Sequence, residues 1–187
     1  MSLNGTASVV VLAGGGIDST ACLYQLRSEG FRTRAVHIDF GQRASALEWQ
    51  AVQRIAKRID VHADQIAVRS RNVFTRDEIP GRNAALVLLG VMHLLPEEKI
   101  ICLGVHAGTP FVDCSKSFVA SLASIVAEQT DSRVRLVAPL HDLTKPETVA
   151  LARSLGVPME LTHSCQTDTP GGCGSCHSCK DRRALGC

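Results

Sequence analysis

Aromatic side chains are scarce in this sequence: phenylalanine, tryptophan and tyrosine together make up 4% of its 187 residues. The scarcity argues against a surface that stacks nucleic-acid bases, because such a surface needs several exposed rings. A marked excess of positive charge is also lacking, since the formal net charge is +2. A clustered basic face is therefore not indicated, and we expect no direct contact with nucleic acid.

Long apolar runs are absent as well. No stretch reaches the length of about 18 consecutive apolar residues that a membrane-spanning helix needs, so no membrane partner is expected. Residues 1–5 contain no basic segment of the kind that begins a signal peptide. These absences predict a cytoplasmic chain, and its 45% hydrophobic content suffices for the core of a single domain.

Short apolar, strand-like runs alternate with segments of helical periodicity along most of the chain. The expected strands are residues 8–13, 33–39, 65–68, 99–104 and 134–137. The expected helices are residues 18–29, 47–59, 83–95, 117–128 and 146–155. Residues 83–95 are so apolar that we expect a buried helix there. Residues 70–81 are expected to form a loop, and regular structure is expected to give out from residue 163 onward.

This alternation predicts an α/β fold with a doubly wound, parallel, five-stranded sheet. In such folds the ligand lies beyond the carboxyl ends of the strands. Those ends are expected at Ala13, Asp39 and Gly104, each followed by a glycine-containing or polar loop. We expect residues 1–160 to form this ligand-binding domain and residues 161–187 to be a C-terminal extension of the same domain.

Three consecutive glycines, residues 14–16, join the first expected strand to the first expected helix. Glycines let the backbone approach an anion closely, and a helix N-terminus offers unpaired N–H groups with partial positive charge. Ser19 and Thr20 add hydroxyl donors, whereas Asp18 suits either a helix cap or Mg²⁺. The loop matches neither G-x-x-x-x-G-K-[ST] nor G-x-G-x-x-G. An ordinary glycine-rich turn capped by Asp18 explains the same residues.

The C-terminal region is rich in cysteine. Its clustered members are Cys165, Cys173, Cys176 and Cys179. In a reducing compartment, clustered cysteines indicate a metal site rather than disulfides. Four thiolates suit tetrahedral Zn²⁺ in a structural role, and the alternatives are an iron–sulfur cluster or free thiols. We interpret His163 and His177 as bystanders, because the four cysteines already complete a ligand set.

The string GGGIDS at residues 14–19 resembles the S-G-G-x-D-S loop with which PP-loop ATP pyrophosphatases hold the pyrophosphate of ATP, although Gly14 stands where that motif has serine. Further strings are FGQR at residues 40–43, PGRN at 80–83, LGV at 103–105, DC at 113–114, PL at 139–140, and Lys145 with Glu147. With the cysteine tail, and in this order, they resemble the 7-cyano-7-deazaguanine synthase (ExsB-type) family over nearly the whole chain.

The resemblance implies a PP-loop enzyme, an ATP-dependent C–N ligase, that uses ATP and Mg²⁺ and carries Zn²⁺. It implies that ATP activates the carboxylate of 7-carboxy-7-deazaguanine and that ammonia attacks it, giving an amide and then a nitrile for the queuosine pathway. A carboxylate is a poor electrophile until it gains a leaving group, so the enzyme would contribute positioning and charge stabilisation. A homodimer is compatible with the sequence.

The resemblance also assigns residues. Those assigned to ATP are Leu12, Ala13, Gly14, Gly15, Gly16, Ile17, Asp18, Ser19, Thr20, Gln42 and Arg43. Arg82 would clamp the phosphates or the substrate carboxylate, because its guanidinium is planar and bidentate. Lys145 would stabilise phosphate charge, and Asp113 would bind Mg²⁺ or substrate. A surface charge or a plain turn residue is the ordinary explanation of each.

The chain departs from the family where the deazapurine is expected to bind. Ala44 replaces the histidine that usually follows Gly-Gln-Arg, and residues 70–79 and 106–112 are shorter than the family's segments. Two other hypotheses follow from these departures. The chain could be a PP-loop ligase or amidotransferase for another acid or acceptor, or a nucleotide-binding module without catalysis.

Overall fold

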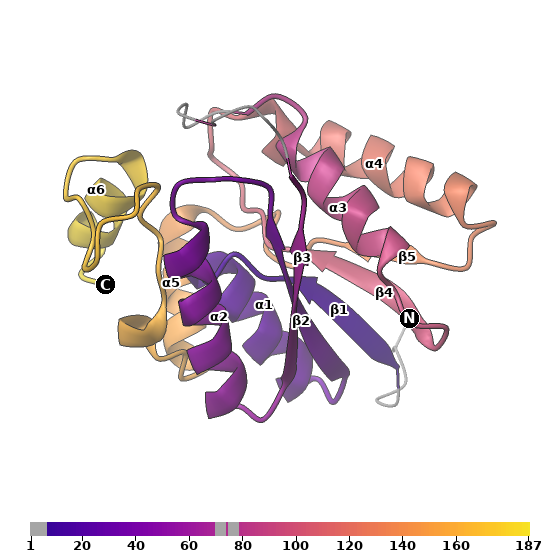
Figure 1. Cartoon of the computed structure of the whole chain (residues 1–187), viewed down its shortest axis with the longest axis horizontal. Helices are drawn as coiled ribbons and strands as arrows, with labels where there is room; N and C mark the ends of the chain where they lie inside the picture. The colour runs from indigo at the N-terminus through magenta and orange to yellow at the C-terminus, as the bar shows by residue number, and fades with distance from the viewer. Residues whose placement is uncertain (1–6, 70–73, 75–78) are drawn as a thin grey trace.

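Five parallel strands form the centre of the computed structural model, which describes residues 7–69, 74 and 79–187 (Figure 1). They are β1 (Ser8–Leu12), β2 (Arg32–Asp39), β3 (His62–Ala67), β4 (Glu98–Leu103) and β5 (Arg135–Val137). Their order is β3-β2-β1-β4-β5, so β1 lies between β2 and β4. The predicted α/β class and parallel five-stranded sheet are confirmed.

Helices cover both faces of the sheet (Figure 1). They are α1 (Ile17–Ser28), α2 (Ser45–Arg58), α3 (Arg82–Met92), α4 (Lys116–Gln129), α5 (Lys145–Ser154) and α6 (His177–Ala184), with single 3₁₀ turns η1 (Val112–Cys114) and η2 (Met159–Leu161). Helices α1, α2 and α5 lie on one face, and α3 and α4 on the other. In the part of the chain that the structure describes, no helix combines the length and apolarity needed to cross a bilayer.

The two hydrophobic cores follow from the alternation of side chains along β1. Val9 and Val11 pack into the core beneath α1, α2 and α5, whereas Val10 and Leu12 pack into the core beneath α3 and α4. Because successive strand residues point to opposite faces, a central strand covered on both sides must be apolar throughout. This double burial explains why β1 is an unbroken apolar run, and it fixes the loop that follows β1 at the centre of the sheet.

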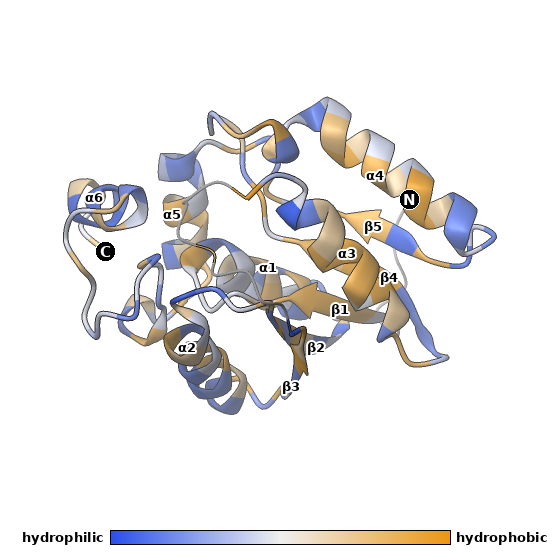
Figure 2. Ribbon diagram, turned by 45° about the horizontal axis from the view of Figure 1, so that its top comes forward, coloured by the Kyte–Doolittle hydropathy of each residue, from blue (hydrophilic) through white to orange (hydrophobic). Residues whose placement is uncertain are grey.

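The expectation of a buried helix at residues 83–95 is wrong. Helix α3 is an outer-layer helix that ends at Met92, and of its side chains only Asn83, Val87 and Gly90 are buried. Met92 is 83% exposed. The sheet covers just one side of α3, so apolar residues on its other side are not buried. The apolar character of α3 is visible as the orange of its ribbon in Figure 2.

The expectation that regular structure ends at residue 163 is also wrong, because α6 lies beyond it. This helix contains no buried residue and is hydrophilic along much of its length (Figure 2). Arg182 anchors it to the body of the protein: its guanidinium donates to Thr162 Oγ1 at 2.6 Å and to the carbonyl of Met159 at 2.9 Å. Polar contacts hold α6 in place, so the apolar periodicity that reveals other helices is missing from its sequence.

The loop expected at residues 70–81 lies largely outside the described residues. Phe74 is described, and it forms an isolated bridge with Gln42 and an edge-to-face contact with Phe40 at 5.5 Å between ring centroids. These contacts attach the described part of this segment to the end of β2, beside the site described next.

Candidate functional site

The carboxyl ends of β1, β2 and β4 open into a cavity of about 500 Å³, a size that suits a small-molecule ligand. Its walls include Ala13, Ile38 and Gly104 from these strand ends. The chain runs from β1 to β2 and β3 on one side of β1, and then crosses to β4 on the other side. The cavity lies where the strand order reverses in this way. The predicted location of the ligand site, beyond the strand ends, therefore coincides with a large cavity.

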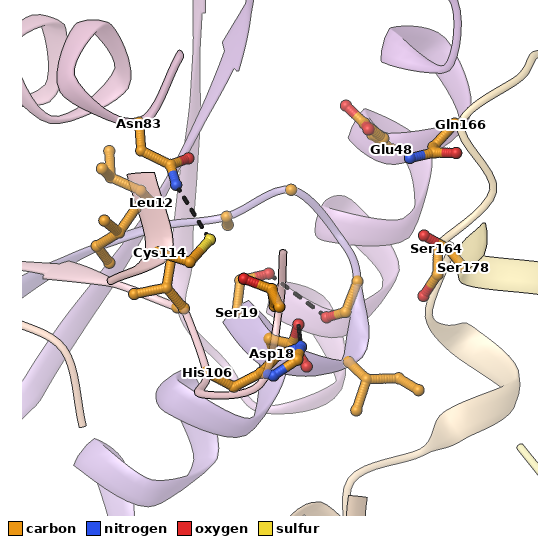
Figure 3. Close-up of a pocket in the computed structure, with 18 of the residues that line it drawn as sticks. Leu12, Asp18, Ser19, Glu48, Asn83, His106, Cys114, Ser164, Gln166 and Ser178 are labelled. Carbon is orange, nitrogen blue, oxygen red and sulfur yellow. Dashed lines mark hydrogen bonds and ion pairs between the residues drawn. The ribbon is translucent and has the colours of Figure 1, made fainter. Parts of the chain in front are cut away.

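The glycine loop lies against this cavity, between Leu12 and Asp18, which Figure 3 labels. The loop and flanking residues that line it are Leu12, Ala13, Gly14, Gly16, Ile17, Asp18 and Ser19. Gly15 and Thr20, which were assigned to the same site, are not among its lining residues. Gly15 adopts φ +70°, and the Thr20 hydroxyl donates to the carbonyl of Gly16 at 2.7 Å. Both shape the turn that presents the N-terminus of α1.

Asp18 forms an ion pair instead of capping a helix. The N-cap of α1 is Gly16, and Lys145 Nζ lies 2.5 Å from Asp18 Oδ1. His106 Nε2 lies 3.8 Å from the other carboxylate oxygen of Asp18. Asp18, Lys145 and His106 come from the starts of α1 and α5 and the loop after β4, and all three line the cavity. His106 was missed by the sequence reasoning, since a single histidine in a loop carries no pattern.

Arg82 and Asp113 lie near each other, but only Arg82 lines the cavity. Asp113 Oδ2 accepts from the backbone N–H of Asn83 at 3.4 Å, and the carbonyl of Asp113 accepts from Asn83 Nδ2 at 3.0 Å. Asp113 thus secures the first turn of α3, which carries Arg82. Cys114 lines the cavity in its place, and burial raises the pKa of its thiol, so the thiol is protonated at neutral pH.

Gln42 and Arg43 diverge in the structure. Gln42 lines the cavity, where its amide donates to Glu48 Oε2 at 2.8 Å and to the carbonyl of Ile38 at 3.1 Å. Arg43 is not among the lining residues; its side chain is 50% exposed, 3.8 Å from Asp168. Gln42 thus lies in the cavity wall, whereas Arg43 lies at the surface.

His37 and Glu48 also line the cavity, although neither was foreseen. Burial lowers the pKa of His37 and raises the pKa of Glu48, so the imidazole is neutral at neutral pH. His37 Nε2 lies 4.0 Å from Glu48 Oε2, and Trp49 stacks on the imidazole at 6.0 Å between ring centroids. Nothing in the sequence pattern joins the end of β2 to the start of α2, because a lone histidine in an apolar strand is typical of a core position.

The C-terminal tail closes one side of the cavity. The lining residues it contributes are His163, Ser164, Gln166, His177, Ser178, Asp181, Arg182, Leu185 and Cys187. His177 lies 3.4 Å from Asp181 on the adjacent turn of α6. The tail is therefore a wall of the site.

The four clustered cysteines converge in space. The Sγ atoms of Cys165, Cys173, Cys176 and Cys179 all lie within 4.8 Å of one another, so this group could hold a metal ion. A tetrahedral site with metal–sulfur bonds of about 2.3 Å needs sulfurs about 3.8 Å apart, so a small contraction completes the geometry. The Ser175 hydroxyl and backbone N–H groups hold the pKa of Cys173 at about 5, which favours the thiolate that binds metal.

Comparison with known proteins gives a consistent result. The family described as "Queuosine biosynthesis protein QueC" matches residues 8–77 and 65–185. The 7-cyano-7-deazaguanine synthase of Geobacter sulfurreducens is 33% identical, over 95% of this chain and 87% of that protein.

Two solved structures share the fold at low sequence identity. U34-tRNA thiolase NcsA from Methanococcus maripaludis superposes with a TM-score of 0.56 at 13% identity, covering 96% of this chain and 64% of that chain. NMN synthetase from Francisella tularensis superposes with a TM-score of 0.55 at 17% identity, covering 97% and 77% respectively. At these identities the likeness concerns the arrangement of the elements alone.

Proposed function

This chain belongs to the family of queuosine biosynthesis protein QueC, and from that membership we propose that it converts 7-carboxy-7-deazaguanine and ammonia to 7-cyano-7-deazaguanine with ATP. The observation that carries the proposal is the single cavity in which the glycine loop, Arg82 and Lys145 meet. A 33% identical relative named 7-cyano-7-deazaguanine synthase, matched over most of both chains, supports the choice of substrate over another acid.

In the proposed reaction, a carboxylate oxygen of the acid attacks the α-phosphorus of ATP, and pyrophosphate leaves. Ammonia then attacks the carbonyl carbon, its nitrogen loses one proton to water, and AMP leaves with the electrons of the acyl–oxygen bond, which yields the amide. A second ATP adenylates the amide oxygen in the same way. Loss of AMP and of the remaining N–H protons gives the nitrile. The protein contributes orientation and stabilisation of charge at each step.

The residues divide between the two substrates in this proposal. The N–H groups at the start of α1 and the open backbone at Gly14 and Gly16 hold the pyrophosphate part of ATP. Lys145 neutralises phosphate charge, and Arg82 clamps the phosphates or the substrate carboxylate with parallel hydrogen bonds. Asp113 acts on Arg82 indirectly by holding the start of α3. Mg²⁺ would be held by Asp18 and would neutralise phosphate charge when bound.

We propose Zn²⁺ as the metal of the cysteine cluster, held by Cys165, Cys173, Cys176 and Cys179 in a structural role. Four sulfur donors without an open position are typical of structural zinc. The ligands precede and enter α6, so the metal would fix the cavity wall that α6 provides. Residues 161–187 are accordingly proposed as the zinc-binding extension of the ATP-binding domain at residues 1–160.

The setting of the protein is part of the proposal. We place it in the cytoplasm, where ATP and the small-molecule acid are available. A homodimer is proposed because apolar side chains lie exposed on the α3 and α4 face, with Met92 83% and Ile125 45% exposed.

Acid-dependent release of pyrophosphate tests the function. Purified protein with ATP, Mg²⁺ and ammonium should release pyrophosphate when 7-carboxy-7-deazaguanine is added, and very little without it. Stimulation by a different carboxylic acid, with no response to the deazapurine, would favour the ligase acting on another substrate. Binding of ATP without turnover of any acid would favour the non-catalytic module.

Substitution of Lys145 by methionine should lower the acid-dependent rate by about 10² to 10³, a typical cost of removing one preorganised charge at a reacting phosphate. The variant also removes the ammonium group nearest to Asp18, so the Asp18 carboxylate would repel the phosphates of ATP more strongly. The matched control is Lys116→Met, since Lys116 forms an exposed ion pair with Asp142 and is not among the residues that line the cavity. Equal rates for the two variants would remove Lys145 from the proposed site.

A further inference from the structure

The proposed reaction needs ammonia, yet in neutral solution this base is present mostly as ammonium, which has no lone pair for attack. A site that supplies the nucleophile must therefore attract a small cation and then accept its proton. A carboxylate beside a neutral imidazole, in a partly dehydrated cavity, has both properties. His37 and Glu48 are such a pair, and the inference drawn from them rests on the proposed function.

The tautomer of His37 follows from its hydrogen bonds. Nδ1 lies 3.0 Å from the carbonyl oxygen of Ala13. A carbonyl can only accept, so Nδ1 carries the hydrogen and donates it. In the neutral ring, Nε2 is then a bare acceptor, and the described residues offer it no hydrogen-bond partner although His37 is only 1% exposed. A buried acceptor left unpaired is costly, so a bound donor is expected there.

The Glu48 carboxylate is the second member of the pair, and the gap between it and His37 has room for one small donor. Its Oε2 lies 4.0 Å from His37 Nε2, too far for a direct hydrogen bond. A single atom placed between them can lie about 2.8 Å from both, which is ideal for a small donor. Gln42 fixes the carboxylate, since its Nε2 donates to Glu48 Oε2 at 2.8 Å. Both His37 and Glu48 line the cavity, and Figure 3 shows Glu48 among its residues.

We propose that Glu48 and His37 form the ammonium-binding and deprotonation site of this enzyme. One N–H of ammonium donates to Glu48 Oε2 and another donates to His37 Nε2. The second N–H bond then breaks: its electron pair stays on nitrogen, and its proton passes to Nε2. Ammonia leaves with a free lone pair, and the imidazolium formed is stabilised by the adjacent carboxylate. The proton returns to cavity water by way of Glu48.

The charges around the pair are compatible with this role. The groups that face Glu48 are Arg82, whose charge lowers the pKa of the carboxyl, and Asp39, whose charge raises it. Around His37 the backbone of Ala13 and the charge of Asp39 both favour the protonated ring, while burial disfavours it. The imidazole is thus neutral at rest but able to take a proton. Arg82 lies close enough to act on Glu48, so ammonia would be released near the proposed carboxylate clamp.

The test is Glu48→Gln, measured as steady-state kinetics of product formation over a range of ammonium chloride concentrations. The KM for ammonium should rise about 10- to 100-fold, as expected for loss of a hydrogen bond to a charged group. Exchange of labelled pyrophosphate into ATP, which needs the acid but no ammonium, should keep its wild-type rate. Saturating ammonium should restore most of the turnover.

His37→Asn provides the second variant, and it should raise the KM for ammonium in the same way. Gln53→Ala, at an exposed position of the same helix α2, is the matched control and should leave both measurements unchanged. An unchanged KM for ammonium in Glu48→Gln would overturn the inference and indicate that a water molecule occupies the gap. A raised KM for the acid or for ATP, with ammonium unaffected, would overturn it too.

Failure of this inference differs visibly from failure of the proposed function. The function fails if the wild-type protein makes no product from the deazapurine acid at any ammonium concentration. The inference fails if the wild-type protein does make product, while the Glu48 variant keeps the wild-type dependence on ammonium.

Discussion

Replacement of Gly15 by alanine should reduce ATP-dependent turnover by about a hundredfold or more. Gly15 has φ +70°, a conformation that costs an alanine about 1–2 kcal/mol. A Cβ at this position would also stand 2.7 Å from the carbonyl oxygen of Glu48 and 2.9 Å from Cβ of Ala51. Backbone of α2 cannot yield to it, so the loop must shift, and a displacement near 1 Å suffices for such a loss of rate.

Gly14→Ser is the matched control, one residue earlier in the same loop. A Cβ at Gly14 meets nothing within 4 Å, and its φ is not in the left-handed region. Turnover should therefore be retained, and the serine would restore the hydroxyl found in the S-G-G-x-D-S motif. Pyrophosphate release with saturating acid measures both variants. Full activity in Gly15→Ala, or loss of activity in Gly14→Ser, would contradict the loop geometry.

Cys176→Ser should remove the bound metal and, with it, most of the activity. Cys176 is one of the four converging sulfurs and is also the N-cap residue of α6. Without the metal, α6 would depend on polar contacts such as those of Arg182 alone, because it buries no residue. We therefore expect the cavity to lose the wall that carries Ser178 and Asp181. Structural metal sites supply folding energy directly, so the tail should become sensitive to protease.

Metal content by elemental analysis is the primary measurement. We expect about one zinc per wild-type chain and almost none in Cys176→Ser. His177→Gln should keep the metal. The His177 imidazole pairs with Asp181, and among the described residues the candidate metal group consists of the four cysteines alone. Metal retained in Cys176→Ser and lost in His177→Gln would refute the four-cysteine assignment. Iron in place of zinc would favour the cluster alternative.

The parallel sheet and the succession of strands and helices along the chain were predictable, because buried positions recur as a periodic pattern of apolar residues in the sequence. β1 is apolar on both faces, and α2 carries Val52, Ile55 and Ala56 at helical spacing, all of them buried. Helix α6 has no such apolar pattern, since side chains such as Arg182 hold it through polar contacts. The prediction of a buried helix at residues 83–95 was wrong for the opposite reason. The sequence of α3 is apolar, but the fold buries only one side of that helix.

The parts of the site that could be predicted are those formed by residues close together in the sequence. The glycine loop at residues 14–19 and the four clustered cysteines are the two examples. Most of the loop lines the cavity, and the four cysteine sulfurs converge. The pairing of Asp18 with Lys145 and the approach of His37 to Glu48 join segments that the fold alone brings together. Asp113 and Cys114 are neighbours in the chain, and only the conformation of η1 decides which one faces the cavity.

The proposed reaction is tested most simply by following nitrogen from ammonium into the product. Purified protein should be incubated with ATP, Mg²⁺, ¹⁵N-labelled ammonium chloride and 7-carboxy-7-deazaguanine, and the products analysed by mass spectrometry. We expect 7-cyano-7-deazaguanine that carries the label in its nitrile, with pyrophosphate formed alongside it. Neither amide nor nitrile after prolonged incubation of folded, metal-loaded protein would contradict the proposed reaction.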